Sequence, residues 1–407
     1  MNILLLTMSA MPSLTDRGIY TDLMRKFRDE GHGVYIVTPV ERRQGIRMNL
    51  SDADGVHILG VRTLNVQKTN VLEKGVGQVS IGMLYKRAIK RYFKGVRFDL
   101  ILYSTPPITL LGVVKYVRRQ NPRAMTYLLL KDIFPQNAVD MGMMSKTGVK
   151  GLLYRYFRRQ EESLYKISDY IGCMSPANVK FLLENNPYIN PARVEVNPNS
   201  IELADEPVKA KDSNRILKKY GIPTDSPVFI FGGNLGVPQG IPFLIECLDA
   251  VKHRQDCHFV VVGTGTYLSR LEDWYAGTRA LAVTVLKGLP KKDYDLLVQA
   301  CQVGLVFLDY RFTIPNYPSR LLSYLENSMA VIACTDPNCD MGSIAEANGY
   351  GFYCPSNDVN AFVKAVDRML DSDFKAMGAK GYGFLKANYL VEHTYNLIMS
   401  HFTGKGI

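Results

Sequence analysis

Short runs of hydrophobic residues alternate along the chain with longer stretches in which hydrophobic positions recur at helical spacing. The short runs predict buried strands, because continuous apolar segments bounded by turn residues suit a sheet that is covered on both faces. Between the first two runs, Leu23, Met24 and Phe27 share one helix face, and Gly31 supplies a helix end. In the first half of the chain we predict strands at residues 3–6, 34–37, 100–103, 126–130, 170–173 and 194–196.

The same alternation restarts after a polar, turn-rich segment at residues 198–227. Alternating strands and helices predict mostly parallel sheets, so the expected fold class is α/β, with two Rossmann-like domains facing a cleft. The second-half strands are predicted at 228–231, 259–262, 283–286, 303–308, 331–334 and 351–353, with a last helix at 373–402. The predicted domains are an N-terminal domain at 1–200, a linker at 201–213, a second domain at 214–385, and a closing helix at 386–407 that packs back toward the first domain.

Positive charge is concentrated in the first half of the chain. The 407 residues carry 49 Lys and Arg against 38 Asp and Glu, and residues 1–200 alone hold 29 against 16. This asymmetry indicates a polyanionic neighbour for the first domain, either nucleic acid or an anionic membrane surface. The balance of 47% hydrophobic and 21% charged positions excludes a disordered or low-complexity chain.

Cysteine usage and the N-terminal sequence both favour a cytoplasmic location. The seven cysteines are odd in number and include no C-x-x-C pair, which argues against a disulfide framework and against a zinc site. The first residues lack a basic leader before their apolar run, so we predict a buried strand there rather than a signal peptide. No apolar stretch is long enough and uncharged enough to cross a membrane, and we expect a soluble or peripheral protein.

Glycines cluster directly after two predicted strands of the second half. Four of them stand between positions 232 and 240, where backbone N–H groups can approach a phosphate at the start of the next helix. A plain strand-to-helix turn is the alternative interpretation. The second cluster, Gly263-Thr264-Gly265, is shorter, and a tight turn explains it as well as ligand contact does.

Charged side chains follow other predicted elements. Pro318 and Ser319 mark a helix start, and Arg320 in the first turn would oppose the helix dipole unless a bound diphosphate compensated it. Glu326, further along that helix, could accept ribose hydroxyls or be a solvated surface residue. Asp132 follows the strand at 126–130 and could take a proton or orient a hydroxyl, with a surface ion pair to Lys131 as the alternative.

Two amphipathic stretches, residues 84–97 and 146–159, interleave Lys and Arg with aromatic and aliphatic residues. This pattern is typical of helices that rest on anionic lipid. A nucleic-acid surface and a simply solvated helix face are the alternatives, although no nucleic-acid motif accompanies the charge. The predicted membrane-contact residues are Lys86, Arg87, Lys90, Arg91, Lys94, Arg155, Arg158 and Arg159.

Hydrolase and metalloenzyme motifs are missing from the sequence. None of the six histidines stands in an H-E-x-x-H motif, and no G-x-S-x-G segment is present. Other short motifs are spread over most of the chain: Gly31-His32, Ser104-Thr105-Pro106-Pro107, Asp132-Ile133-Phe134-Pro135, Val196-Asn197-Pro198-Asn199-Ser200, Gly233-Asn234-Leu235-Gly236, Gln239-Gly240, Gly263-Thr264-Gly265 and Pro318-Ser319-Arg320.

Taken together, these motifs resemble glycosyltransferase family 4, the retaining group with two Rossmann-like domains in the GT-B arrangement. The chain is most similar to bacterial surface-polysaccharide members that include N-acetyl-L-fucosamine transferases. The resemblance implies that Asp132 lines the reaction cleft from the acceptor domain. The implied donor-binding residues are Gly18, Gly233, Asn234, Gln239, Gly265, Gly288, Leu289, Ser319, Arg320 and Glu326.

The chain departs from the family pattern at several positions, which changes the roles expected of these residues. Where many members clamp the diphosphate with Arg and Lys, this chain has Asn234 and Gln239, so Arg320 becomes the candidate for the compensating charge. The paired glutamates of the family are replaced by Pro315 and Ser323. Glu326 lies nearly one helical turn beyond the second of these positions and could take over the ribose contact.

We therefore expect a cytoplasmic, peripheral-membrane, retaining glycosyltransferase. It would move a sugar from a UDP-linked donor to a polyprenyl-diphosphate-linked glycan in capsule, O-antigen or exopolysaccharide assembly. Helix N-termini and Arg320 would stabilise the leaving diphosphate, so neither a metal nor a cofactor is expected, and no nucleic acid is expected as a partner. The competing classes are a sugar-nucleotide epimerase of the same fold and a non-enzymatic module that binds membrane or RNA.

Overall fold

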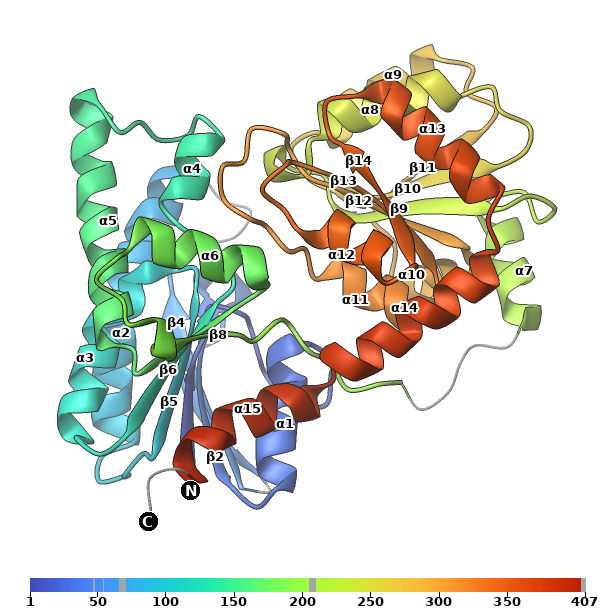
Figure 1. Cartoon of the computed structure of the whole chain (residues 1–407). Coiled ribbons are helices and arrows are strands. Elements are labelled where there is room, and N and C mark those ends of the chain that lie inside the picture. The colour runs from blue at the N-terminus through green and yellow to red at the C-terminus, as the bar shows by residue number, and fades with distance from the viewer. Residues whose placement is uncertain (47, 54, 66–70, 205–209, 404–407) are drawn as a thin grey trace. The chain divides into compact units, whose positions relative to one another are not determined.

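The computed structural model describes residues 1–46, 48–53, 55–65, 71–204 and 210–403, and these residues form two compact α/β units (Figure 1). Unit 1 comprises Met1–Glu202 together with Val391–Ile407, and unit 2 comprises Leu203–Leu390. The predicted linker at 201–213 includes residues 205–209, and the predicted closing helix includes residues 404–407; both of these stretches lie outside the described residues.

Unit 1 is built on an eight-stranded sheet in the order β3-β4-β2-β1-β5-β6-β7-β8. Neighbouring strands are parallel except β3 and β4, which are antiparallel. The central strands are buried along almost their whole length, because helices cover both faces of a parallel sheet. The strands are β1 (Asn2–Leu6), β2 (Gly33–Glu41), β3 (Asn49–Ala53), β4 (Val56–Thr63), β5 (Leu100–Thr105), β6 (Met125–Leu130), β7 (Tyr170–Cys173) and β8 (Val194–Val196).

Helices α1 and α15 pack side by side on one face of this sheet, and α2, α3 and α5 lie together on the other (Figure 1). Gly31 ends the first helix region with a φ of +80°, a backbone conformation that glycine adopts without strain. The helices of unit 1 are α1 (Ile19–Asp29), α2 (Val71–Tyr92), α3 (Leu111–Gln120), α4 (Gln136–Asp140), α5 (Gly148–Ile167), α6 (Pro176–Asn185) and α15 (Val391–Thr403), with short 3-10 turns η1 (Arg42–Gln44), η2 (Ile108–Leu110) and η3 (Pro191–Arg193).

Unit 2 is built on a six-stranded, fully parallel sheet in the order β11-β10-β9-β12-β13-β14. This is the strand order of the doubly wound Rossmann fold, whose ligand site lies where the order reverses, here between β9 and β12. The strands are β9 (Val228–Asn234), β10 (His258–Thr264), β11 (Val283–Lys287), β12 (Val303–Phe307), β13 (Ala330–Thr335) and β14 (Gly351–Pro355).

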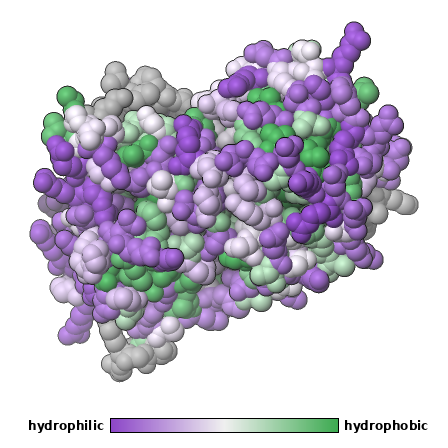
Figure 2. Space-filling model, turned by 45° about the horizontal axis from the view of Figure 1, so that its top comes forward, coloured by the Kyte–Doolittle hydropathy of each residue, from purple (hydrophilic) through white to green (hydrophobic). Residues whose placement is uncertain are grey.

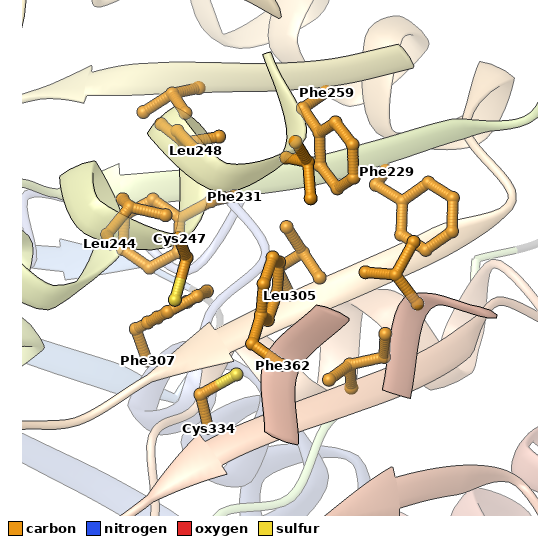
Figure 3. Close-up of a cluster of buried hydrophobic side chains, with 14 of the residues drawn as sticks. Phe229, Phe231, Leu244, Cys247, Leu248, Phe259, Leu305, Phe307, Cys334 and Phe362 are labelled. Atoms are coloured by element: carbon orange, nitrogen blue, oxygen red, sulfur yellow. The ribbon is translucent and has the colours of Figure 1, made fainter. Parts of the chain in front are cut away.

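One face of the unit 2 sheet buries an aromatic-rich core, in which Phe229, Phe231, Phe259 and Phe307 pack against Phe362 of α13 (Figure 3). These strand residues alternate with residues that face the opposite helices, as the pleat of a strand requires. The helices of unit 2 are α7 (Ala210–Lys219), α8 (Ile241–Val251), α9 (Leu268–Gly277), α10 (Lys291–Ala300), α11 (Arg320–Glu326), α12 (Met341–Ala347), α13 (Val359–Leu370) and α14 (Phe374–Asn388), with the 3-10 turn η4 (Val237–Gln239).

The structure confirms the predicted α/β class and all the predicted strands, and it corrects two details. Strands β3 and β4 fall in a region where no strand was predicted, because exposed polar residues of β3 interrupt the apolar pattern. The predicted single helix at 373–402 is two helices, α14 and α15, which belong to different units. The chain passes from unit 2 to unit 1 between Leu390 and Val391.

The molecular surface in Figure 2 is mainly hydrophilic, with hydrophobic patches scattered among polar side chains. Within the described ranges, none of the helices combines the length and the hydrophobicity of a membrane span.

Candidate functional site

The carboxyl end of β9 in unit 2 approaches the neighbouring strand more closely than side chains would allow. Gly233 lies opposite Gly263 in the register of β9 and β10. A Cβ atom on Gly263 would lie 2.0 Å from the carbonyl oxygen of Gly233, and one on Gly265 would lie 2.4 Å from that of Leu235. Both glycines are therefore required for packing, which is a structural reason for the second glycine cluster. Ligand contact by Gly265 stays a prediction.

Arg320, the first residue of α11, reaches this strand end. Its guanidinium carbon lies 4.3 Å from the centre of the Phe231 ring. A Cβ atom on Gly233 would lie 3.4 Å from Nη2 of Arg320, and the φ of +121° at Gly233 is one that glycine favours. The fold thus places Gly233, the predicted phosphate-binding glycine, next to Arg320, the predicted compensating cation.

The Arg320 guanidinium is charged but has no anionic partner. Its Nη1 atom is buried and makes no hydrogen bond, and no carboxylate among the described residues pairs with it. Burial lowers the pKa of Arg320 from its ordinary value, yet a guanidinium keeps its proton in proteins. An unpaired charge in a buried position is costly, so the environment of Arg320 favours the binding of an anion.

Two tyrosines that sequence reasoning missed shape this neighbourhood. The Tyr324 hydroxyl accepts a hydrogen bond from the Gly232 amide at 3.3 Å and lies 3.2 Å from the carbonyl oxygen of Ile230. A Cβ atom on Gly232 would lie 2.1 Å from the Tyr294 hydroxyl oxygen, so that ring packs directly on the strand end. The Pro318-Ser319-Arg320 motif marked the start of α11, but no motif marked the tyrosines as parts of a site.

The loop after β9 is held by its own side chains and by the loop after β12. The Asn234 side-chain amide donates to Oε1 of Gln239 at 2.9 Å, which joins the two residues that replace the family's basic clamp. The backbone amide of Asp309 donates to the carbonyl oxygen of Pro238 at 3.0 Å. Gly240, with a φ of +56°, ends this loop immediately before α8.

The remaining predicted donor residues of unit 2 fall into two groups. Gly288 and Leu289 follow β11, and the Gly288 amide donates to the Gly263 carbonyl at 3.1 Å, so this turn adjoins the glycine loops. Ser319 precedes α11 as its N-cap residue and its side chain makes no capping hydrogen bond; donor contact by Ser319 stays a prediction. Glu326 is the last residue of α11, and its carboxylate accepts from the Ala204 amide at 2.9 Å.

The structure does not bring Glu326 to the carboxyl end of the sheet. Arg320 begins α11 and Glu326 ends it, so about 9 Å of helix axis separates them. The chain enters β13 soon afterwards, from the opposite edge of the sheet. Ribose contact by Glu326 stays a prediction, with Glu326 on the last residue of α11 and Arg320 on the first.

In unit 1, Asp132 lies at the carboxyl end of β6, as predicted. Its Oδ1 atom accepts from the Ile133 amide at 2.8 Å and its Oδ2 atom accepts from the Asn137 side chain at 2.6 Å. Burial raises the pKa of Asp132 to about 6, although these two donors oppose the shift. The alternative of a surface ion pair with Lys131 is wrong, because the Lys131 ammonium turns instead to the carbonyl oxygen of Asn197.

Gly18 also lies in unit 1, directly before α1. Its backbone is extended, with a φ of 172°, and its amide donates to the buried Asp22 carboxylate at 2.9 Å. Asp22 in turn pairs with Arg25 at 2.6 Å. The local structure thus holds Gly18 rigidly at the helix start, and donor contact there stays a prediction.

The predicted membrane-contact residues lie on α2, on α5 and just after α2. Lys86, Arg87, Lys90, Arg91 and Lys94 are exposed, whereas Tyr85 is fully buried and donates to the Thr7 carbonyl. Phe93 is also buried and Tyr92 is half-buried, so the first stretch offers mainly charge.

The second stretch, on α5, differs from the first. Val149 is 86% exposed, Leu152 is 61% exposed, and Leu153 and Tyr156 are also exposed, close in sequence to the exposed Arg155 and Arg159. Arg158 is the exception, because its guanidinium pairs with the buried Glu161 and donates to Asn186.

The described residues hold no group of three or more His, Cys, Asp or Glu side chains that could bind a metal ion. The site in unit 2 consists instead of backbone amides, amide side chains, tyrosine hydroxyls and one guanidinium. These groups suit a phosphate-bearing ligand at the carboxyl edge of a Rossmann-like sheet.

Comparisons with known proteins agree with a Rossmann-like domain that binds a phosphate-bearing ligand. Residues 212–383 match the family described as "Glycosyl transferases group 1". The "Probable glycosyltransferase WbjE" of Pseudomonas aeruginosa is 24% identical over 327 residues, which cover 79% of this chain and 78% of that protein. The "Putative colanic acid biosynthesis glycosyl transferase WcaI" of Escherichia coli K12 is 22% identical over 389 residues, covering 91% of this chain and 92% of the relative.

Among solved structures, "Trehalose-6-phosphate from E. coli bound with UDP-2-fluoro glucose" matches with a TM-score of 0.71 at 12% identity, and the match covers 98% of each chain. The fold of this chain is therefore that of the GT-B glycosyltransferases. The family match of the second unit and the two relatives support a glycosyltransferase as the class of protein.

Proposed function

We propose that the protein is a retaining glycosyltransferase of family 4. It transfers a sugar from a UDP-linked donor, bound by unit 2, to a polyprenyl-diphosphate-linked acceptor, bound by unit 1. The similarity to relatives named for glycosyl transfer and for colanic acid biosynthesis supports a role in the assembly of a bacterial surface polysaccharide. The solved relative with a bound UDP sugar supports UDP as the nucleotide.

The observation that carries the proposal is the unpartnered guanidinium of Arg320 beside Gly233. A nucleotide diphosphate supplies the missing negative charge, and it gains more as the sugar leaves, because the diphosphate then takes on additional charge. An interaction that strengthens along the reaction in this way lowers the barrier. Asn234 and Gln239, already hydrogen bonded to each other, offer neutral donors and acceptors beside the charge.

In the proposed reaction, the bond between the anomeric carbon and the diphosphate oxygen breaks, and an acceptor hydroxyl oxygen forms the new glycosidic bond on the same face of the sugar. The acceptor proton passes to the departing phosphate oxygen. Because the new bond forms on the face from which the diphosphate leaves, the anomeric configuration is retained. Asp132 orients the acceptor hydroxyl and assists at most, since its carboxylate is engaged by Ile133 and Asn137.

The experiment that tests this function measures UDP release from UDP sugars, with and without a lipid-linked acceptor extract. We expect UDP release only when the acceptor is present. Interconversion of the sugar without acceptor would identify an epimerase instead. Absence of both, with membrane or RNA binding intact, would identify a binding module.

We predict that the transfer needs no divalent metal, because Arg320 provides the charge that a metal would otherwise place on the diphosphate. Initial rates are expected to be unchanged after treatment with EDTA and removal of the chelated ions. Loss of activity in EDTA that Mg²⁺ or Mn²⁺ restores would contradict this prediction.

We also predict that unit 1 binds anionic membranes through α2 and α5. The exposed basic residues contribute on the order of 1 kcal/mol each near an anionic surface, and this part of the binding weakens with salt. The exposed leucines of α5 add a part that salt does not screen. Vesicle sedimentation is expected to show binding that requires anionic lipid and decreases with NaCl.

Two sets of variants separate these contributions. Changing Lys86, Arg87, Lys90 and Arg91 to Glu is expected to reduce low-salt binding, while Leu152→Ser with Leu153→Ser removes the salt-resistant fraction. The matched control changes four exposed basic residues of unit 2 to Glu and should bind nearly as the wild type does: Arg270, Arg279, Lys291 and Lys292. Equal loss in the control set would show that overall charge, rather than this surface, governs binding.

A further inference from the structure

Lys131 stands at the carboxyl end of β6, one residue before Asp132, but its side chain takes a different direction. The ammonium nitrogen donates to the carbonyl oxygen of Asn197 at 3.3 Å, beyond the end of β8. The side chain is half-buried and passes Cys173, the last residue of β7. Lys131 therefore lies over the ends of three adjacent strands, at the edge of the sheet where ligands of such folds bind.

The carboxylates near Lys131 are already engaged. Glu195 of β8 accepts from the Tyr127 hydroxyl at 2.6 Å and lies 3.1 Å from His401 of α15. Asp132 accepts from Ile133 and Asn137, as described above. Within the described residues Lys131 consequently has no ion pair, and one of its three donor positions is used, by a long bond to a backbone carbonyl.

This environment disfavours the charged amine until an anion arrives. Burial lowers the pKa of Lys131 to about 7. Cys173, the titratable group on β7, does not supply the charge, because burial holds its pKa well above the usual range and leaves it a neutral thiol. An anion beside the ammonium would restore the pairing that a buried cation requires.

We infer that Lys131 anchors a phosphate of the lipid-linked acceptor in unit 1. The inference rests on the proposed function, and it assigns to unit 1 a binding group for the acceptor's diphosphate that is separate from the donor cation Arg320 in unit 2. Lys131 and Asp132 are consecutive at the carboxyl end of β6, so one strand end supplies both the inferred phosphate anchor and the carboxylate proposed to orient the acceptor hydroxyl. Their side chains turn in different directions.

The test uses geranyl diphosphate as a short, soluble probe, with UDP present at saturation so that the donor site is occupied. In calorimetry, Lys131→Met is expected to weaken probe binding at least tenfold at pH 6.5, while Lys131→Arg stays within a few-fold of the wild type. Lys115→Met, which changes an exposed lysine of α3, serves as the control. Inorganic phosphate in place of the probe shows whether the site recognises any phosphate or requires the lipid-linked form.

The pH dependence of probe affinity is a second measurement, because a lysine with a purely structural role would not change it. The ammonium form binds the anion, and with a pKa of about 7 its share is about half at pH 7, nearly complete below about pH 6, and falls as the pH rises above 7. The probe itself also titrates, and it does so equally with both proteins. Dividing the affinity of the wild type by that of Lys131→Arg therefore removes this contribution. This ratio is expected to be constant at low pH and to fall by up to tenfold per pH unit above pH 7.

Equal probe affinity of the wild type and Lys131→Met, or an affinity ratio that does not change between pH 6 and pH 9, would overturn the inference. The melting temperature of each variant shows that the fold is retained, and replacing an unpaired buried cation with methionine is expected to preserve it. Failure of UDP itself to bind would contradict the proposed function. The difference in probe affinity between the Lys131 variants is measured separately and does not depend on that result.

Discussion

Replacing Arg320 with methionine is expected to weaken UDP binding by at least 30-fold, which corresponds to about 2 kcal/mol. The variant removes charge-assisted hydrogen bonds to the diphosphate, and bonds to charged groups contribute about 1.5–3 kcal/mol each. The fold should not suffer, because the guanidinium has an unpaired, buried Nη1 atom in the ligand-free protein. Isothermal titration calorimetry with UDP measures the loss, and thermal melting checks the fold.

Arg368 offers a matched control for this experiment. Its guanidinium carbon also lies over a phenylalanine ring of unit 2, 4.1 Å from the centre of Phe352, but its side chain is exposed and close to Glu346. Arg368→Met should therefore leave UDP affinity unchanged. Equal UDP affinity in the wild type and in Arg320→Met, with both proteins folded, would reject Arg320 as the diphosphate-binding cation.

Replacing Gly263 with alanine is expected to destabilise unit 2 by about 1–3 kcal/mol or more and to abolish measurable UDP binding. The added Cβ atom would lie 2.0 Å from the Gly233 carbonyl oxygen, so β9 or β10 has to shift. Backbone atoms give way at much greater cost than a flexible side chain does. The shift would move Gly233 away from Arg320, and thermal unfolding together with UDP titration measures both consequences.

Gly383→Ala is the matched control, since Gly383 is exposed within α14 and a Cβ atom there meets nothing within 4 Å. Alanine is favoured over glycine in a helix by roughly 0.5–1 kcal/mol, so this variant should melt at the same or a higher temperature. A Gly263→Ala protein with wild-type stability and UDP affinity would show that the strand end does not need its close approach.

The strands other than β3 and β4 could be predicted from the sequence because buried parallel strands are continuous apolar runs. The surroundings of Arg320 could not, because Phe231 on β9 and Tyr294 on α10 are distant from it in sequence, and Tyr324, one helical turn along α11, stands in no motif. Sequence spacing alone also did not show that Glu326 ends the short helix that Arg320 begins.

Asp132 and Lys131 illustrate a different limit of sequence reasoning. Adjacent opposite charges suggested a solvated pair, since nothing in a local pattern shows that two neighbouring side chains turn in different directions. The structure gives each its own partners: Asn137 for Asp132, and the Asn197 carbonyl for Lys131. Lys131 and Asp132 are therefore two separate candidate binding groups rather than one ion pair.

Helix α15 gives unit 1 a discontinuous chain, so unit 2 is in effect an insertion within unit 1. Val391 and Ile398 of α15 belong to the core of unit 1, and the Val391 amide donates to the Ile201 carbonyl at 3.1 Å. During synthesis on the ribosome, residues 1–202 must therefore wait for the whole of unit 2 to emerge before their core is complete. Residues 203–390 form a continuous segment, so we expect them to fold as an independent fragment, whereas a fragment that stops before α15 would leave unit 1 with an uncovered apolar surface.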